Sequence, residues 1–186
     1  INVQPACYQA RANGLPNILL LGDSTAFAYT HGLAAVLKDQ ANILLWANAG
    51  CPILPMHGND RNPVCLENSR VFYQEILPKN HYDIVIIAAA SAVKDLEAAL
   101  PAAVQVLERS GARVVVVGQP PTFTDKVPNL IAMHGTTAGL GEYLAKHTWE
   151  GCVGESGLER LVAPGRYFAV QKVLCLPTGI RYQDDD

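Results

Sequence analysis

The stretch Asn17-Ile-Leu-Leu-Leu-Gly22-Asp23-Ser24 decides the fold class of this 186-residue chain. Its first six residues form a short aliphatic run that ends at a glycine. A continuous apolar run, rather than an alternating one, is typical of a strand that is buried on both faces. Residues 26–38 then place apolar side chains at helical spacing. The stretch therefore predicts a buried strand that turns sharply into a helix.

The same pattern recurs along the first two thirds of the chain. Three further aliphatic runs are predicted strands: 42–47, 83–88 and 113–118. Helical patterns separate them at 66–77 and 93–110, and Pro101 is expected to start a second segment within the latter. Alternation of buried strands with helices predicts a mainly parallel sheet covered by helices on both faces, which is a three-layer α/β/α sandwich.

The pattern weakens beyond Gly118, where several prolines interrupt it. We expect helices at 140–149 and 158–162, and a late strand or extended segment at 167–175. No internal repeat or low-complexity linker is visible. The sequence therefore predicts a single domain over residues 1–186, with residues 1–16 as an N-terminal extension.

Composition and charge exclude several classes of protein. At 49% hydrophobic and 17% charged residues, the chain is too apolar for intrinsic disorder. With 14 Lys+Arg against 17 Asp+Glu it lacks the basic balance of a nucleic-acid-binding protein. No apolar run approaches the ~18 residues of a membrane span, and no signal peptide is visible. Because the sequence starts at Ile1, we expect a mature form or an excised fragment.

The formal charge of −3 equals the charge of residues 184–186, which are all aspartates. A solvated acidic tail is one interpretation of such an ending.

Five cysteines are far apart in the sequence: Cys7, Cys51, Cys65, Cys152 and Cys175. No C-x-x-C pair occurs and no histidine lies at zinc-finger spacing, so no structural zinc site is expected. Cys51 and Cys65 enclose a loop rich in Pro, Gly and Asn, where a disulfide would stabilise a segment with little apolar surface. This pairing favours an oxidising compartment. Buried thiols in a cytosolic protein are the alternative, and the other cysteines stay unassigned.

Ser24 is the strongest candidate nucleophile. In a parallel α/β sheet, ligands bind beyond the carboxyl ends of the strands, and Ser24 follows the first strand at a tight turn. Its own N–H and the positive end of the next helix can stabilise an oxyanion there. The alternative is that Asp23 or Ser24 only caps the helix. A phosphate-binding loop is disfavoured, because neither glycine-rich fingerprint is present.

A serine nucleophile needs a base, normally a histidine oriented by a carboxylate. The chain has five histidines, none of which has a spacing that marks it as that base: His31, His57, His81, His134 and His147.

The end of the first strand resembles the first signature block of the SGNH/GDSL hydrolase family, whose Gly-Asp-Ser nucleophile maps to Ser24. Asn48-Ala49-Gly50-Cys51-Pro52 looks like the second block, and Gly50 is then an oxyanion-hole donor. The last block of the family is Asp-x-x-His. Residues 182–186 look like that block cut off before its histidine, which makes Asp184 the triad aspartate and position 187 the missing base.

A finer resemblance is to the periplasmic SGNH domains fused to acyltransferase family 3 membrane proteins. Supporting stretches are 116–121 (Val-Val-Gly-Gln-Pro-Pro) and 173–175 (Val-Leu-Cys). The resemblance implies acetyl transfer to a bacterial surface polysaccharide through an acyl-enzyme on Ser24. It also implies an acyl donor, a glycan acceptor, an attached transmembrane acyltransferase domain, a periplasmic or extracellular location and no cofactor or metal.

The sequence departs from the family at the third block, where Ser91 follows a run of alanines in place of the oxyanion-hole asparagine. The Ser91 hydroxyl is the candidate substitute. Two other functions remain open at this point: a free-standing secreted carbohydrate acetylesterase or deacetylase, and a catalytically silent glycan-binding domain.

Overall fold

A computed structural model describes residues 4–55, 62–89, 93–135, 139–149 and 157–181 of the chain. Contacts between residues divide the chain into two compact units. The first unit comprises Ile1–Val117 and Gly157–Phe168, and the second comprises Gly118–Ser156 and Ala169–Asp186. None of the helices in the described residues combines the length and apolarity that a bilayer crossing requires.

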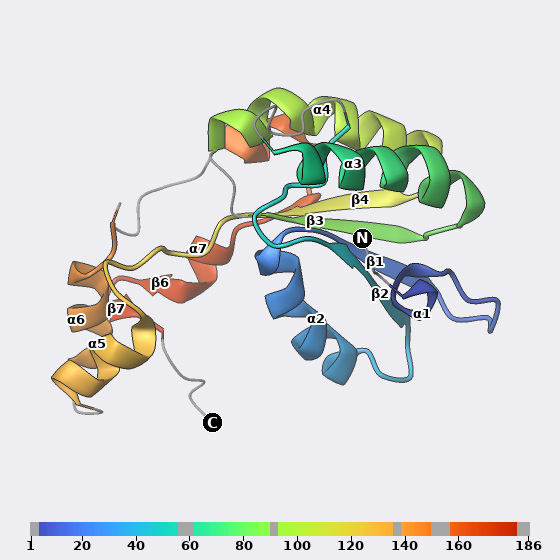
Figure 1. The fold of residues 1–186 in the computed structure, drawn as a ribbon. Helices are drawn as coiled ribbons and strands as arrows, with labels where there is room; N and C mark the ends of the chain where they lie inside the picture. Colours follow the sequence, from blue (N-terminus) through green and yellow to red (C-terminus); the bar gives the residue numbers. More distant parts are fainter. Residues whose placement is uncertain (1–3, 56–61, 90–92, 136–138, 150–156, 182–186) are drawn as a thin grey trace. The chain divides into compact units, whose positions relative to one another are not determined.

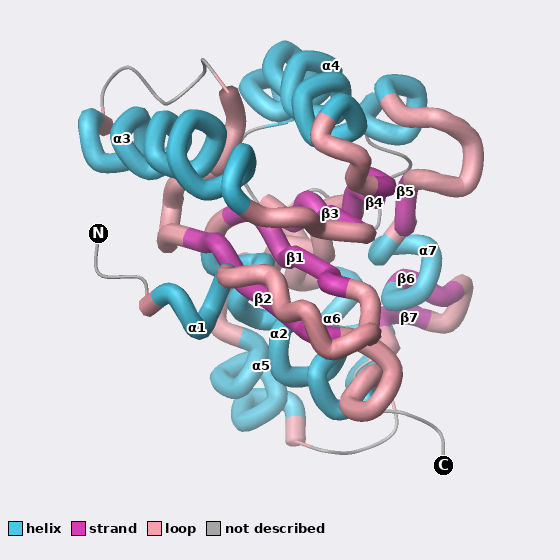
Figure 2. The backbone as a smooth tube through the Cα atoms, turned by 90° about the vertical axis from the view of Figure 1, so that its right-hand side faces the viewer, coloured by secondary structure: helices cyan, strands magenta, loops and turns pink. Residues whose placement is uncertain are grey.

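The first unit is built on a five-stranded sheet in which all neighbouring strands are parallel. The strand order is β2-β1-β3-β4-β5 (Figure 2). The bounds are β1 Asn17–Gly22, β2 Asn42–Ala47, β3 Ile84–Ala88, β4 Arg113–Val117 and β5 Tyr167–Phe168. The four strands predicted from aliphatic runs are therefore confirmed, each to within one residue at either end.

Helices cover both faces of this sheet, which confirms the α/β class and the layered arrangement (Figure 1). Alternate residues of β1 face opposite sides. Leu20 packs with Ala26 of α2 (Ser24–Val36). Leu19 and Leu21 belong to the larger core cluster, which includes buried residues of α3 (Pro63–Val71) and α4 (Val93–Arg109).

Two of the helices that cover the sheet differ from their predicted form. The helix predicted at 66–77 begins earlier, at Pro63, and continues as a π-helical turn η1 (Phe72–Ile76) and a 3₁₀ turn η2 (Leu77–Lys79). The expectation that Pro101 starts a new segment is wrong, because α4 runs through it without a break.

The segment before β1 is fastened to the amino ends of the strands. It contains the short helix α1 (Pro5–Tyr8) and then a set of amide hydrogen bonds. The side chain of Asn13 exchanges hydrogen bonds with that of Asn42 (2.9 and 2.8 Å), and Asn42 also donates to Asn17 (3.1 Å). Asn17 and Asn42 are buried, so these bonds satisfy polar groups that would otherwise be costly.

The second unit is smaller and mostly helical. Its elements are α5 Val127–His134, α6 Leu140–Lys146, α7 Val170–Leu174 and the antiparallel pair β6 Cys175–Leu176 and β7 Gly179–Ile180. Its described core comprises Leu130, Leu140, Leu144 and Ile180. The extended segment predicted at 167–175 is wrong for most of its length, because β5 ends at Phe168 and α7 follows. The helix predicted at 158–162 is a 3₁₀ turn, η3 (Gly157–Leu161), in the first unit.

Candidate active site

The turn from β1 into α2 is held against the neighbouring strand β3. A Cβ atom placed on Gly22 would overlap the carbonyl oxygen of Ala88, so only glycine fits there without a shift of the backbone. The N–H of Asp23 donates to the same carbonyl (3.4 Å). The end of β1 is therefore fixed directly beside the end of β3.

Asp23 and Ser24 have different roles at this turn. The buried carboxylate of Asp23 caps α2, since its Oδ1 accepts from the N–H of Thr25 (2.8 Å). Ser24 is the first residue of the helix and is exposed. No hydrogen bond of its hydroxyl is found among the described residues. The first N–H groups of a helix have no intrahelical acceptor, so the Ser24 N–H is available at the positive end of α2.

Gly50 lies in a turn at the end of β2, the strand on the other side of β1. The N–H of Asn48 donates to the carbonyl of Gly22 (3.2 Å), which ties this turn to the turn that carries Ser24. The N–H of Cys51 donates to the carbonyl of Asn48 (2.9 Å) and closes the turn. Gly50 is its third residue, with φ of 71°, a left-handed conformation that favours glycine.

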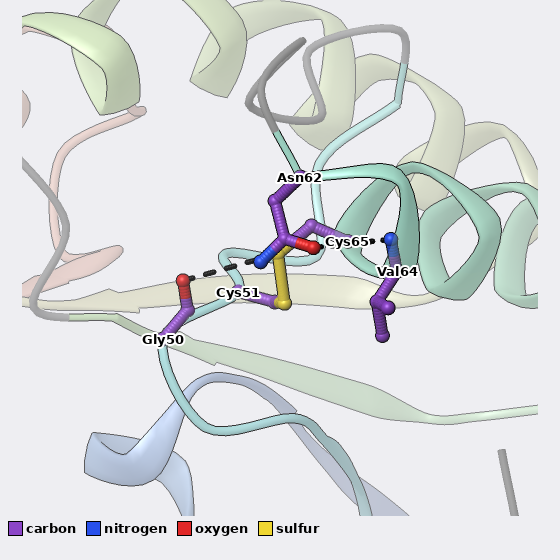
Figure 3. Close-up of a disulfide and its surroundings, with 5 residues drawn as sticks. All are labelled: Gly50, Cys51, Asn62, Val64 and Cys65. Atoms are coloured by element: carbon purple, nitrogen blue, oxygen red, sulfur yellow. Dashed lines mark hydrogen bonds between the residues drawn. A yellow bond between two sulfur atoms is a disulfide. The ribbon is translucent and has the colours of Figure 1, made fainter.

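A disulfide links this turn to α3. The predicted pair Cys51–Cys65 is confirmed, with an S–S distance of 2.02 Å, and both cysteines are buried in the main core (Figure 3). Cys175 is also disulfide-bonded, Cys7 is free and exposed, and Cys152 lies outside the described residues.

Asn62 is a residue near this turn that the sequence analysis did not identify. Its Oδ1 accepts from the N–H of Val64 (3.1 Å) and so caps α3. Its side-chain amide is turned toward the carbonyl of Gly50 (Figure 3). Asn followed by Pro63 is a recognisable helix-start signal, but its approach to Gly50 depends on the fold.

Two predicted site residues lie outside the described residues, namely Ser91 and Asp184. Their roles stay predictions. The described part of the chain does place the end of β3 beside Gly22, and Ser91 follows that end by three residues.

Within the first unit, no contact among the described residues brings His31 or His81 to the turn at Ser24. His31 lies on α2 and is exposed. His81 pairs with Asp83 (3.6 Å) at the amino end of β3. In the second unit, the rings of His134 and His147 contact the ring of Tyr143, with centroid distances of 4.6 and 4.1 Å. His57 lies outside the described residues.

The described residues contain no group of three or more His, Cys, Asp or Glu side chains that could hold a metal ion. The turns after β1 and β2 instead bring together an exposed hydroxyl and backbone N–H groups. This combination is suited to a serine nucleophile with an oxyanion hole.

Comparisons with known proteins identify the family and the fold of the chain. A family model described as "SGNH domain (fused to AT3 domains)" matches residues 2–177. No curated protein matches the chain. The periplasmic domain of a lipopolysaccharide acetyltransferase from Salmonella ser. Paratyphi A has a similar structure, with a TM-score of 0.63 and 14% identity. The alignment covers 94% of this chain and 77% of that one, and at this identity the similarity shows the fold.

Proposed function

We propose that this chain, which belongs to the family of SGNH domains fused to AT3 domains, transfers acetyl groups to a bacterial surface polysaccharide through Ser24. The observation on which the proposal depends most is the position of Ser24. Its hydroxyl is exposed at the start of α2 and at the carboxyl edge of the sheet, while Asp23 performs the capping. Ser24 is thus not needed as a helix cap.

The proposed reaction has two steps. The Ser24 Oγ attacks the carbonyl carbon of the acyl donor, its proton passes to a histidine base, and the donor leaves as an alcohol or thiol that takes this proton. An acyl ester on Ser24 remains. A sugar hydroxyl then attacks the carbonyl carbon of this ester, and the same histidine takes the proton of that hydroxyl. The histidine returns the proton to the Ser24 Oγ as the bond to the acetyl group breaks, and the acetylated glycan leaves.

The oxyanion of each tetrahedral intermediate is stabilised by the N–H groups of Ser24 and Gly50, with the Ser91 hydroxyl as a third proposed donor. The proposed base is the histidine of the family's Asp-x-x-His block, in which Asp184 is the proposed aspartate. Asp184 orients it and stabilises its charged form.

The surroundings of the domain are part of the proposal. The family description indicates an attached AT3 acyltransferase domain, which we propose supplies the acyl group from the membrane. The Cys51–Cys65 disulfide supports an oxidising compartment, so we propose that the domain works in the periplasm.

The test uses the full-length natural protein. Ser24→Ala is expected to lower acetyl-ester turnover about 10⁴-fold or more, because the nucleophile is lost while the oxyanion hole stays. Ser110→Ala is the matched control, since Ser110 directly follows α4 and its hydroxyl donates to the carbonyl of Leu107. Unchanged turnover in Ser24→Ala would contradict the proposal.

Two further measurements separate the alternatives. A serine-reactive phosphonate that labels the wild type and not Ser24→Ala would exclude a catalytically silent glycan-binding domain. Acetylated glycan as the main product indicates a transferase, whereas free acetate with no glycan product indicates an esterase.

A further inference from the structure

We infer that Asn62 and the Cys51–Cys65 disulfide position the turn at Gly50, so that its N–H points into the oxyanion hole. The inference rests on the proposed function and adds Asn62 to it as a positioning residue. The backbone of the turn at Gly50 would not by itself hold the N–H in one direction.

The direction of the Gly50 N–H depends on the sign of φ at Gly50. Four-residue turns differ in the orientation of their central peptide, and this orientation follows whether the third residue has positive or negative φ. Glycine adopts both signs about equally well. Among the described residues other than its two chain neighbours, no atom lies within 4 Å of a Cβ built on Gly50, so packing of these residues does not select the sign. Contacts made by the Gly50 carbonyl and by the residues that follow Gly50 must therefore select the sign of φ.

The residues that follow Gly50 are firmly held. Cys51, Ile53 and Leu54 are each no more than 2% exposed. Besides the disulfide, the hydroxyl of Tyr73 donates to the carbonyl of Ile53 (3.2 Å). The chain leaving the turn is therefore fixed in the core, while Gly50 itself is exposed.

Two groups from the start of α3 converge on the Gly50 carbonyl. The Sγ of Cys65 lies 3.9 Å from its oxygen. The side-chain amide of Asn62 is turned toward the same carbonyl, while its Oδ1 caps α3 (Figure 3). Contacts that hold the Gly50 carbonyl in one direction also hold the ψ angle of Gly50. Because the turn is closed by the hydrogen bond from the Cys51 N–H to the Asn48 carbonyl, a fixed ψ then favours the observed positive φ. Asn62 thus couples the first turn of α3 to the orientation of the Ala49–Gly50 peptide, whose N–H would donate to the oxyanion.

The decisive variant is Asn62→Asp in the full-length protein. Aspartate caps a helix as well as asparagine does, so the thermal midpoint is expected to stay unchanged. Its second oxygen, however, replaces the amide nitrogen and repels the Gly50 carbonyl. We expect kcat for acetyl-ester turnover to fall about ten-fold with KM unchanged, because a misdirected donor is felt mainly in the transition state. Gln40→Glu adds the same charge on the exposed loop before β2 and is expected to leave kcat unchanged.

The disulfide is tested with Cys51→Ala/Cys65→Ala, assayed at a temperature where circular dichroism shows the variant to be folded. The rate of phosphonate labelling at Ser24 is expected to fall by the same factor as kcat, since both reactions develop an oxyanion. Cys7→Ser, at the free exposed cysteine, is the control.

The outcomes distinguish the two proposals. Full turnover in Ser24→Ala defeats the proposed function. Turnover that depends on Ser24, together with wild-type kcat in Asn62→Asp, defeats the positioning role. The backbone amide resonance of Gly50 gives a readout that needs no activity: it should shift in Asn62→Asp and stay in place in Gln40→Glu, and an unshifted resonance would overturn the inference in any case.

Discussion

At the scale of single residues, three consecutive positions have three different physical roles. Gly22 makes room for β3, Asp23 caps the helix, and Ser24 is left exposed. The sequence identified Ser24 and the two possible caps, because strand, turn and helix signals are local. It could not identify the reason for Gly22, since the carbonyl of Ala88 is brought there by a strand pairing more than sixty residues away.

Gly22→Ala is expected to destabilise the protein by about 2–3 kcal/mol, because its methyl group would overlap backbone that is held in a central strand. Gly32→Ala is the matched control. Gly32 lies inside α2, and outside its own stretch of helix no atom of the described residues lies within 4 Å of a built Cβ, so alanine should stabilise the helix by about 0.5–1 kcal/mol. Urea unfolding measures both. Equal effects of the two substitutions would contradict the close approach to Ala88.

Asn62 and Gly50 show where residue-level prediction ends. A type of turn and a helix cap are both visible as local patterns. The contact between the turn at Gly50 and the cap at Asn62 is not visible as a local pattern, because it depends on how α3 is placed over the sheet.

At the scale of elements, continuous aliphatic runs predicted the strands well, since a buried parallel strand needs little beyond such a run. Helix ends were predicted less well. The cap at Asn62 and Pro63 lengthens α3 at its start. The segment 170–174 contains two valines and resembles a strand, yet it forms α7. Short segments are decided by their surroundings more than by propensity.

Pro101→Ala is expected to stabilise the protein by about 1–3 kcal/mol. A proline inside a helix has no N–H for the carbonyl four residues earlier, and Pro101 is exposed, so its ring adds little to the core. Ala102→Gly, at the exposed neighbouring position, should cost about 1 kcal/mol. Urea midpoints with unchanged slopes would measure both effects. A loss of stability in Pro101→Ala would mean that α4 needs the proline to follow the sheet.

At the scale of the whole molecule, the division into two compact units was not visible in the sequence. The reason is that the chain returns to the first unit at residues 157–168 and then leaves it again, so no linker marks a boundary. The sheet-bearing unit contains the larger described core. The buried Tyr82 belongs to this core and the partly buried Tyr73 packs against it, and both link global stability to pH.

Stability is expected to fall as pH rises above about 10, the usual tyrosine pKa. Burial raises the pKa of Tyr73. The pKa of Tyr82 is also raised, mainly by burial and to a smaller extent by the charge of the nearby Tyr8. Above pH 10 the unfolded chain loses these protons while the folded chain retains them, so each tyrosine lowers the free energy of unfolding by about 1.4 kcal/mol per pH unit. The contribution of the two tyrosines to the free energy of unfolding is therefore complete below pH 10. It is lost as the pH rises from 10 toward the pKa of each tyrosine in the folded protein.

Tyr82→Phe isolates this effect. At neutral pH it should cost about 1 kcal/mol, because the Tyr8 carbonyl loses the hydroxyl that donates to it (2.8 Å). Above pH 10 its unfolding free energy should fall less steeply than that of the wild type, as measured by urea unfolding at pH 7 to 11. Parallel curves for the two proteins would contradict the linkage.

The amide bonds among Asn13, Asn17 and Asn42 have a mechanical consequence. They join the segment before β1 to the amino ends of β1 and β2, whereas Ser24 stands beyond the opposite, carboxyl end of β1. Tension applied through that segment would load these bonds before it reached the turn that carries Ser24. These bonds would therefore shield the turn at Ser24 from forces that act on the segment before β1.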